Sequence, residues 1–417
     1  MEKKLALYGG EKTKTTPYGT GKKFGKEELV QLEEALNQNT LFYWSGNKVK
    51  TLCDKFAKMY GKKYCVAASS GTAALHVALG ALGITEGDEI ITSPITDMGS
   101  IIGAMYQNAI PVFADLDPHT YNLDPKSVEA CITEKTKAIV VVHLAGNACE
   151  MDEIMDIAKR HNLYVVEDCA QSYMTRYKGK LVGTIGDMGC FSLNDFKHIS
   201  AGDGGMVLVN NEDFYQKAFM FADKNYNRFS GGGTRVLREI EFLAPNYRMN
   251  ELTGAVGIAQ LDKLENICAI RKKHGDRITE GIKDIPGVFP HLVKDYNEAS
   301  YWFYMFRVDP KEIGTDMKTF TEALQAEGIQ CQQGYIPAVV YLYDMFLNKE
   351  GYLGTHAPFD SHYYGKEITY KEGLCPVAEE ILETAIRVNI SEFYTDQDIS
   401  DIINAIIKVT DYFRDKK

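Results

Sequence analysis

Apolar and polar residues follow two alternating patterns between about residue 62 and residue 210. Short runs rich in β-branched residues predict strands at 64–68, 89–93, 110–114, 138–144, 164–167, 189–192 and 206–209. Longer stretches with helical periodicity predict helices at 72–82, 98–108, 151–161 and 211–222. Strands that alternate with helices are typical of βαβ units, in which helices cover both faces of a mostly parallel sheet. This part of the chain is therefore expected to adopt an α/β fold.

The pattern changes beyond this region. A long apolar-periodic stretch, 249–274, predicts a single helix that leads out of the first domain. Residues 288–334 predict a smaller strand–helix–strand unit, and residues 335–380, which lack a clear period, are expected to form a long excursion over the site. Within the smaller unit we expect a strand at 301–308 and a helix at 317–327. Two further helices are expected at 377–384 and 396–413.

These elements divide the chain into three expected parts. Residues 1–30 form an N-terminal arm that packs elsewhere, such as on a partner subunit. Residues 31–265 form a large domain, and residues 266–417 form a small C-terminal α/β domain. The charged opening of the arm lacks the apolar core of a secretory signal.

Composition and charge exclude several classes of protein. The hydrophobic and charged fractions, 45% and 25%, are ordinary for a globular protein, and the net charge of −11 argues against nonspecific binding to nucleic acid or anionic membranes. No apolar run approaches the roughly 20 residues that span a bilayer. The nine cysteines form no Cys-x-x-Cys pair, which favours a reduced, cytoplasmic protein. His143 and Cys149 are close in sequence, but nothing nearby completes a zinc site, so no metal is predicted.

One lysine stands out because of its place between secondary-structure elements. Lys197 follows the predicted strand at 189–192 and precedes a glycine-rich turn, and Asp168 ends the strand before it. Pyridoxal phosphate (PLP) chemistry needs such a pair, since the lysine forms a Schiff base with the cofactor aldehyde and the aspartate keeps the pyridine nitrogen protonated. Either residue alone is commonly structural, as a solvated charge or a turn residue.

A candidate phosphate site lies at the start of the predicted helix 72–82. Ser70, Gly71 and Thr72 follow a strand and open this helix, so backbone N–H groups, hydroxyls and the helix dipole would converge there. An ordinary helix N-cap is the alternative interpretation. The Gly202-Asp203-Gly204-Gly205 turn does not match a dinucleotide fingerprint and precedes a strand, so we expect its glycines to allow a sharp bend beside a cofactor.

Other polar residues have two interpretations each. Asn246 and Arg248, which precede a helix, are candidates for contact with a phosphate or carboxylate, although Asn246 also suits a helix cap. His143, at a strand end, is a candidate for contact with the cofactor ring or a substrate oxygen, although such a histidine is more often structural.

Several motifs together resemble the DegT/StrS family of PLP-dependent sugar aminotransferases, which have the aspartate-aminotransferase (type I) fold. The resemblance runs through Ser69–Leu75, Asp117–Asp124, His143–Gly146, Glu167–Gln171, Tyr177–Gly183, Phe191–Ser192 with Lys197, Gly202–Gly205 and Asn246–Met249. It implies a mostly parallel central sheet with helices on both faces and a smaller C-terminal α/β domain. Motifs that recur in family order are more specific than any one of them.

The resemblance implies a role for each matching residue. Lys197 and Asp168 would be catalytic, and Gln171 would contact the cofactor ring hydroxyl. The phosphate would be held by Ser70, Gly71, Thr72 and Ser192. Asn246 would come from the neighbouring subunit, which implies a homodimer. His143, Tyr247 and Arg248 are candidates for substrate contact.

Two segments depart from the family pattern. Met98 stands where the family often has an aromatic residue that stacks on the cofactor, so Met98 is the expected ring contact here. Residues 387–391 replace a Leu-Pro pair, and we expect a change at the substrate edge there.

The implied reaction moves an amino group from glutamate or glutamine to a keto-sugar, nucleotide-linked or not, or to a ketocyclitol, with ping-pong kinetics. Lys197 favours transamination over the sugar dehydratase chemistry of relatives that carry histidine at this position. A PLP-binding regulator without turnover is a further alternative, and a nicotinamide enzyme is disfavoured because the dinucleotide fingerprint is missing. Candidate cations for a nucleotide are Lys22, Lys23, Arg228, Arg235 and Arg238, and residues 225–233 suggest a substrate loop.

Overall fold

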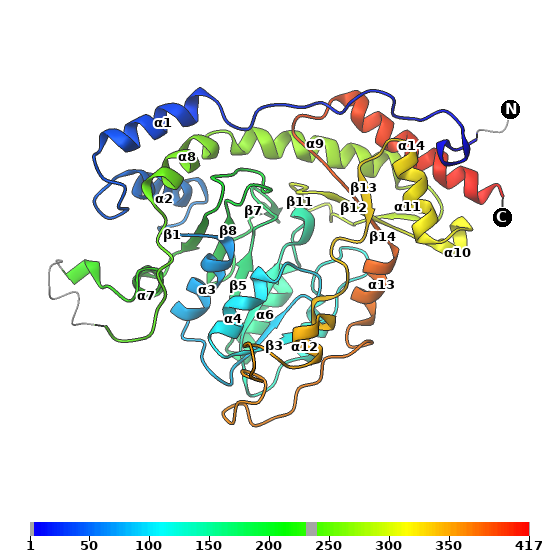
Figure 1. Cartoon of the computed structure of the whole chain (residues 1–417). Helices are drawn as coiled ribbons and strands as arrows, with labels where there is room; N and C mark the ends of the chain where they lie inside the picture. Colours follow the sequence, from blue (N-terminus) through cyan, green and yellow to red (C-terminus); the bar gives the residue numbers. More distant parts are fainter. Residues whose placement is uncertain (1–3, 231–239, 417) are drawn as a thin grey trace.

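A seven-stranded sheet forms the centre of the larger part of the molecule (Figure 1). The computed structural model describes residues 4–230 and 240–416. The strands lie in the order β1-β9-β8-β5-β4-β2-β3. Their bounds are β1 (Tyr64–Ala68), β2 (Glu89–Thr92), β3 (Ile110–Phe113), β4 (Thr136–Val142), β5 (Tyr164–Asp168), β8 (Met188–Ser192) and β9 (Gly205–Val209). The five strands from β8 to β3 are parallel, and β9 is antiparallel to both of its neighbours.

Helices cover both faces of this sheet, as the alternation of elements predicts. Along β4, Val140 packs on one face with α3 and α7, whereas Ile139 and Val141 pack on the other with α2, α6 and α8. The helices are α2 (Lys48–Met59), α3 (Gly71–Ala81), α4 (Gly99–Tyr106), α5 (Pro125–Ala130), α6 (Met151–His161), α7 (Glu212–Ala222) and α8 (Glu251–Leu261). Strands buried on both faces are nearly all apolar, because neither face meets water.

A four-stranded antiparallel sheet forms the smaller unit, in the order β10-β12-β14-β13. These strands are β10 (Val288–Pro290), β12 (Tyr304–Val308), β13 (Cys331–Gln333) and β14 (Ala385–Val388). They pack on α9 (Leu264–Ile282), α10 (Pro310–Ile313), α11 (Met317–Ala326) and α14 (Asp396–Arg414). The remaining elements are α1 (Lys26–Asn37), α12 (Asp344–Leu347), α13 (Pro376–Thr384), the three-stranded sheet of β6 (Arg176–Tyr177), β7 (Lys180–Leu181) and β11 (Asn297–Glu298), and short 3-10 turns at Ala6–Tyr8, Leu144–Gly146, Arg228–Ser230 and Val340–Leu342.

Three expectations need correction. The helix expected at 249–274 is two helices, α8 and α9, because the chain turns at Asp262 and Lys263 while the apolar period continues through the turn. Helices α1 and α2 were not predicted. The excursion at 335–380 covers the site only at its beginning, and the rest packs on the β2 and β3 edge, where Tyr364 donates to Glu89 and Tyr370 to the carbonyl of Pro111.

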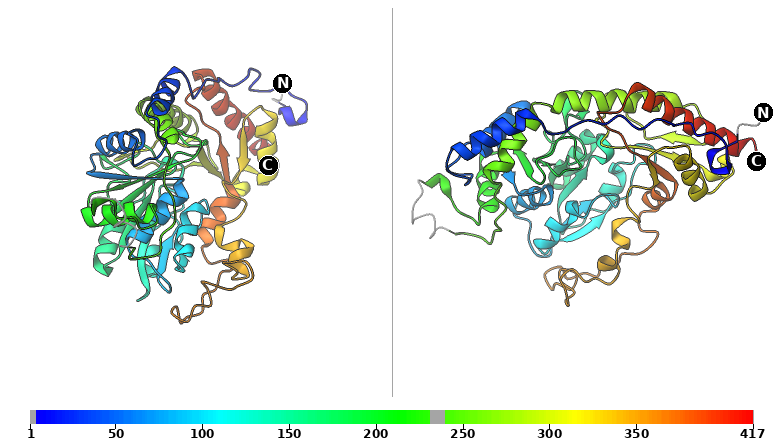
Figure 2. Two further views of the ribbon diagram at one scale, coloured as in Figure 1. Left: turned by 60° about the vertical axis from the view of Figure 1, so that its left-hand side comes forward. Right: turned by 45° about the horizontal axis from the view of Figure 1, so that its top comes forward.

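The described part of the N-terminal arm contacts helix α14 of its own chain. Figure 2 shows it running along α14 and α9 before it reaches α1. The Lys14 ammonium lies 2.5 Å from Asp398 and 3.3 Å from Asp401 on α14, and both partners of the shorter pair are buried. Asp398 also accepts hydrogen bonds from the backbone N–H groups of Gly19 and Thr395. The domain boundaries given above stay a prediction.

None of the helices within 4–230 and 240–416 is long and apolar enough to cross a bilayer.

The arm contact predicts a stability effect. Burial raises the pKa of Asp398, but Lys14 and the backbone donors have the larger, opposite effect. The result is a pKa of about 2, below the usual value of an aspartate. A lowered carboxyl pKa adds stability above the unfolded value of about 4, and this stability is lost as the pH falls from about 4 to about 2. Asp398→Asn should destabilise the fold by about 3 kcal/mol near neutral pH, because it breaks a buried ion pair. It should also remove part of the acid-induced decrease in the thermal midpoint.

Thermal unfolding and trypsin cleavage within the arm measure this effect. The control is Asp396→Asn on the same helix, which breaks an exposed pair with Lys273 and should cost less than about 1 kcal/mol. Equal midpoints for the two variants would show that the Lys14 contact does not hold the arm.

Candidate active site

The carboxyl ends of three strands place the predicted cofactor residues at one edge of the central sheet. Asp168 is the last residue of β5, Ser192 is the last of β8, and the turn after β1 leads into α3. These strands point the same way, since β8 is parallel to β5 and β9 reverses between β8 and β1. Ligands of α/β sheets bind outside this edge.

Asp168 is held rigidly at this edge. Its Oδ2 accepts a hydrogen bond of 2.6 Å from the Ser100 hydroxyl, and its Oδ1 accepts one of 3.0 Å from the backbone N–H of Ala170. Burial raises the pKa of Asp168, whereas these donors and the charge of Lys197 lower it. A cationic ring nitrogen beside Asp168 would favour the carboxylate form further, because an opposite charge stabilises the ionised group.

Lys197 lies in the loop that follows β8, with its ammonium facing the same region. Its Nζ lies 3.8 Å from the centre of the Trp302 ring, and the Trp302 Nε1–H donates to the Phe196 carbonyl. Burial lowers the pKa of Lys197, the charges of Asp168 and Asp97 raise it, and that of Arg387 lowers it. A depressed pKa makes the neutral amine, which is the nucleophile and the base, more available near neutral pH.

The N-terminus of α3 forms the candidate phosphate cradle. The Ser70 hydroxyl accepts a hydrogen bond from the N–H of Ala73 as an N-cap. At Gly71, an added Cβ would lie 2.6 Å from the Ser192 Cβ, so only glycine leaves this space open between the turn and β8. The Thr72 hydroxyl lies beside Gly99, at the start of α4. Hydroxyls, a free helix end and an open space suit a phosphate, so these residues fit the cofactor.

Gln171 follows the end of β5, and Met98 precedes α4, the helix that carries Ser100. The Gln171 Oε1 accepts from the N–H of Ala145 at 2.8 Å, which directs its Nε2 toward the Tyr335 hydroxyl at 3.3 Å. Met98 precedes α4 and is half-buried against the apolar core. The roles of these residues toward a cofactor ring stay predictions.

His143 belongs to a buried network beneath the edge. Its Nδ1 accepts from the N–H of Cys149 at 3.1 Å, so its Nε2 carries the proton and donates to Glu167 at 3.1 Å. The ring is fully buried, and both nitrogens have partners, which supports the structural interpretation and leaves no nitrogen for a substrate.

Glu167 shares this network. It also accepts from the backbone N–H groups of Gly183, Ile185 and Gly186, each at 2.7 Å. Burial raises the pKa of Glu167, but His143 and the backbone donors have the larger, opposite effect, so the pKa lies below its usual value. His143, Glu167 and Cys169 lie close enough to share a metal ion, yet the carboxylate is already satisfied by these donors, and burial raises the pKa of the Cys169 thiol.

The segment 246–248 does not meet Lys197 within the same chain. Asn246 is exposed, the Tyr247 hydroxyl lies 2.9 Å from the His76 Nδ1, and Arg248 pairs with Asp223 at 3.2 Å. Arg228 also pairs with Asp223, at 2.5 Å. Of the other candidate cations, Lys22 is exposed and Lys23 donates to the carbonyl of Asp195, whereas Arg235, Arg238 and part of the expected loop at 225–233 lie outside the described residues.

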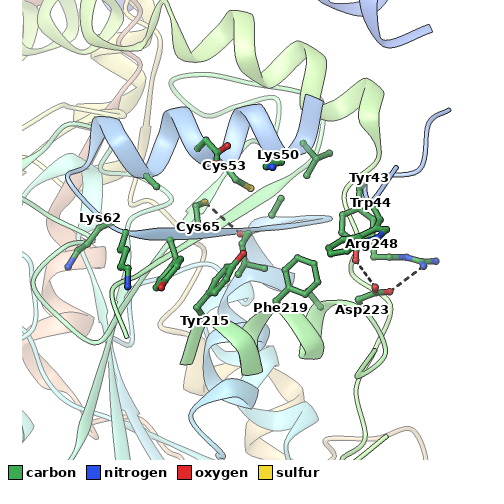
Figure 3. Close-up of a pocket in the computed structure, with 18 of the residues that line it drawn as sticks. Tyr43, Trp44, Lys50, Cys53, Lys62, Cys65, Tyr215, Phe219, Asp223 and Arg248 are labelled. Carbon is green, nitrogen blue, oxygen red and sulfur yellow. Dashed lines mark hydrogen bonds and ion pairs between the residues drawn. The ribbon is translucent and has the colours of Figure 1, made fainter. Parts of the chain in front are cut away.

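A cavity of about 720 Å³ lies between α2 and α7, beside the edge strand β1 (Figure 3). Aromatic side chains form much of its wall, and Arg248 lies at one end. Lys197 and Asp168 do not line it. This cavity is therefore distinct from the cofactor edge.

Four further residues complete the site. They are Ser100, Trp302, Tyr335 and Arg387, of which the sequence indicated only Arg387, through the segment 387–391 expected at the substrate edge. Ser100 starts a predicted helix next to Met98, which was a usable signal. The other three come from the smaller unit, where the departure from the family pattern at 387–391 was the usable signal.

Comparison with known proteins identifies the family of the chain. Residues 22–407 match the model of the DegT/DnrJ/EryC1/StrS aminotransferase family. The spore coat polysaccharide biosynthesis protein SpsC of Bacillus subtilis (strain 168) is 33% identical over 92% of this chain and 94% of its own. A putative L-glutamine:3-amino-2,3-dideoxy-scyllo-inosose aminotransferase of Micromonospora echinospora is 30% identical over 99% of this chain and 98% of its own.

A solved structure shows the same fold. The aminotransferase from Psychrobacter cryohalolentis superposes with a TM-score of 0.82 at 29% identity and covers 94% of this chain and 98% of its own. Fold and site together define an α/β PLP-dependent aminotransferase. The chain belongs to the DegT/DnrJ/EryC1/StrS aminotransferase family.

The surroundings of Lys197 predict its titration in the cofactor-free protein. Reductive methylation with formaldehyde should modify Lys197 with a pKa below that of exposed lysines. Asp168→Asn should lower this pKa further, because it removes a charge that stabilises the ammonium. Mass spectrometry of the Lys197 peptide across a pH series measures it, with exposed Lys50 as an internal reference. An unchanged pKa in Asp168→Asn would show that the two groups do not interact.

Proposed function

We propose that this enzyme transfers an amino group from glutamate or glutamine to a ketone acceptor. The acceptor is either a keto-sugar, nucleotide-linked in the favoured case, or a ketocyclitol. The observation that carries the proposal is the meeting of Lys197, Asp168 and the α3 cradle at one sheet edge. When bound there, PLP supplies an aldehyde for the amine and a ring that takes up the electrons of the broken C–H bond.

The residues of the chain divide the work of positioning and proton transfer. Ser70, Gly71, Thr72 and Ser192 would hold the phosphate, Asp168 would keep the proton on the ring nitrogen, and Gln171 would contact the ring hydroxyl. Met98 would pack against the ring in place of an aromatic residue. The Lys197 Nζ, whose pKa is lowered by burial, takes the proton from the donor α-carbon and returns it at the next step.

The nature of the acceptor is supported by the names of relatives. One relative is named for an aminated inosose, a ketocyclitol derivative, and a relative in Escherichia coli O157:H7, 38% identical over 67% of this chain, is named GDP-perosamine synthase. The first name also specifies L-glutamine as the donor. These names support both acceptor classes for this chain. The nine free cysteines support a reducing compartment such as the cytoplasm.

A homodimer with shared sites completes the proposal. Asn246 is exposed, and its backbone pairs with that of Asp223 after α7 rather than with a residue of the cofactor edge. Near it, Leu243 is 95% exposed and Ile240 is 54% exposed, and Trp44 is exposed at the rim of the cavity. Large apolar residues that gather on a surface favour contact with another copy of the chain.

The absorption spectrum of the PLP-loaded protein tests the function. The band of the Lys197-bound cofactor should give way to a band at shorter wavelength when L-glutamate or L-glutamine is added, and a keto-sugar or ketocyclitol should restore it. Lys197→Ala should lower turnover by about 10³-fold or more while the protein still folds. Asp168→Ala should retain weak cofactor binding but lose most of the activity.

Each outcome has a consequence. If neither donor moves the band, the bound cofactor serves a dehydratase-like reaction or a regulatory role. Comparable turnover in Lys197→Ala would remove the assigned role of this lysine. If added PLP produces no band, the cofactor assignment fails.

Mixing two inactive variants tests the shared site. In the proposed dimer, each site takes Lys197 from one chain and Asn246 from the other. A mixed dimer of Lys197→Ala and Asn246→Ala therefore keeps one intact site. Since about half of the dimers in an equal mixture are mixed, roughly a quarter of the wild-type activity should return. Asn250→Ala, at another exposed asparagine of this segment, is the matched control. It should keep its activity without any mixing, because Asn250 is not assigned to the site. Absence of recovery, in a mixture shown to exchange subunits, would place Asn246 outside the partner's site.

A further inference from the structure

The side chain of Arg387 points from the smaller unit toward the active site. On β14, Ile386 and Val388 are fully buried in the core of the smaller unit. Successive residues of a strand point to opposite faces, so Arg387 points away from that core. Its partner across the sheet on β12 is Met305, which packs in the core of the larger unit. Arg387 therefore lies on the face that meets the cofactor edge.

The guanidinium of Arg387 has aromatic neighbours but no acidic partner. Its centre lies 5.0 Å from the Phe303 ring and 6.0 Å from the Tyr335 ring. The Nε is buried without a hydrogen-bond partner among the described residues, and no ion pair of this guanidinium occurs there. Arg307, one strand away, is different, because its guanidinium bonds Thr384 and Glu380.

The guanidinium of Arg387 is half-buried, and its buried Nε has lost its hydration without gaining a partner among the described residues. Burial lowers the pKa of Arg387, but a guanidinium still keeps its proton in proteins. Charged groups that are withdrawn from water are normally paired, because an unpaired one loses hydration without compensation. The chain thus keeps a positive charge and a free N–H facing its active site. An anionic ligand would supply the partner that the described residues do not provide.

A chain of side-chain contacts joins Arg387 to Lys197. Lys197 lies over the Trp302 ring, Trp302 is 6.0 Å from the Tyr335 ring, and Tyr335 lies beside Arg387 and accepts from Gln171. The charges of Arg387 and Lys197 also act on each other. The reacting carbon of an amino donor must meet the Lys197 Nζ, so its α-carboxylate, one bond away, lies in this region.

We propose that Arg387 binds the α-carboxylate of the amino donor. This inference rests on the proposed function and names a specificity residue for it. A planar guanidinium matches a carboxylate with two parallel hydrogen bonds. A single arginine among aromatic rings also suits the single charge of a carboxylate better than the two charges of a diphosphate. Asp97 is the nearby acid whose charge acts on Lys197 and Tyr335, but it is exposed and accepts from the N–H of Gly99.

The kinetic test separates the two half-reactions. Because donor and acceptor react in turn at one site, stopped-flow spectra give kcat/KM for each separately. Arg387→Gln should lower kcat/KM for L-glutamine or L-glutamate by about 100-fold, mainly through KM, since it removes a charged hydrogen-bond pair. The value for the keto acceptor should change by less than about threefold. A selective loss on the acceptor side would assign Arg387 to an anionic group of the acceptor and overturn the proposal.

A binding measurement without turnover supplies a second readout. The probe is 4-carbamoylbutanoate, which is glutamine that lacks the α-amine but keeps the carboxylate. Calorimetry on the PLP-loaded protein gives its Kd. Arg387→Gln should weaken this binding by about tenfold or more, while GDP, the probe for a nucleotide diphosphate, should bind as to the wild type. Weakened GDP binding with unchanged 4-carbamoylbutanoate binding would contradict the proposal.

Two further variants control for folding. Arg307→Gln removes an arginine from the neighbouring strand and should leave both half-reactions unchanged. Arg387→Lys keeps the charge but loses the planar fork, and it should recover part of the donor affinity. If Arg387→Gln does not fold, Arg387→Lys decides, and full donor affinity in it would overturn bidentate binding. A wild-type protein that fails both half-reactions would refute the proposed function, whereas an active wild type with unaffected Arg387 variants would refute only this inference.

Discussion

The buried carboxylate of Glu167 fixes the part of the sheet on which the site depends. Three backbone N–H groups and His143 surround it, so the turn before β8 is tied to the end of β5. The next residue, Asp168, points to the other face because side chains alternate along a strand. Donors lower the pKa of the first carboxylate, and burial raises that of the second. One carboxylate is thus structural, and its neighbour is free for chemistry.

The sequence predicted those features that local patterns encode. Strands β5 and β8 were expected from their apolar runs, and the meeting of Asp168, Ser192 and Gly71 followed because parallel strands end at a common edge. The break between α8 and α9 was missed because a two-residue turn does not disturb an apolar period. Trp302 and Tyr335 were missed for another reason: they are more than 100 residues from Lys197 in the sequence, and only the packing of the smaller unit brings them close to it.

The site therefore combines two units with different chemistry. The larger unit supplies the strand ends, the helix terminus and the lysine loop, which are the parts that a cofactor phosphate and ring require. The smaller unit supplies aromatic rings and the guanidinium of Arg387, which face the opposite side of Lys197. In the proposed enzyme, the cofactor end would be shared with relatives of this family, and the substrate end would vary with the segment 387–391.

The contact between Lys197 and Trp302 gives the molecule an internal optical reporter. The chain has two tryptophans, and Trp302 lies with its ring beneath the lysine amine, whereas Trp44 stands on a distant, exposed surface. A chromophore attached at that amine would lie in direct contact with the indole and would quench its emission. Replacing Trp44 with phenylalanine would leave one emitting residue, so that ordinary fluorescence would follow loading and release of the active site in real time.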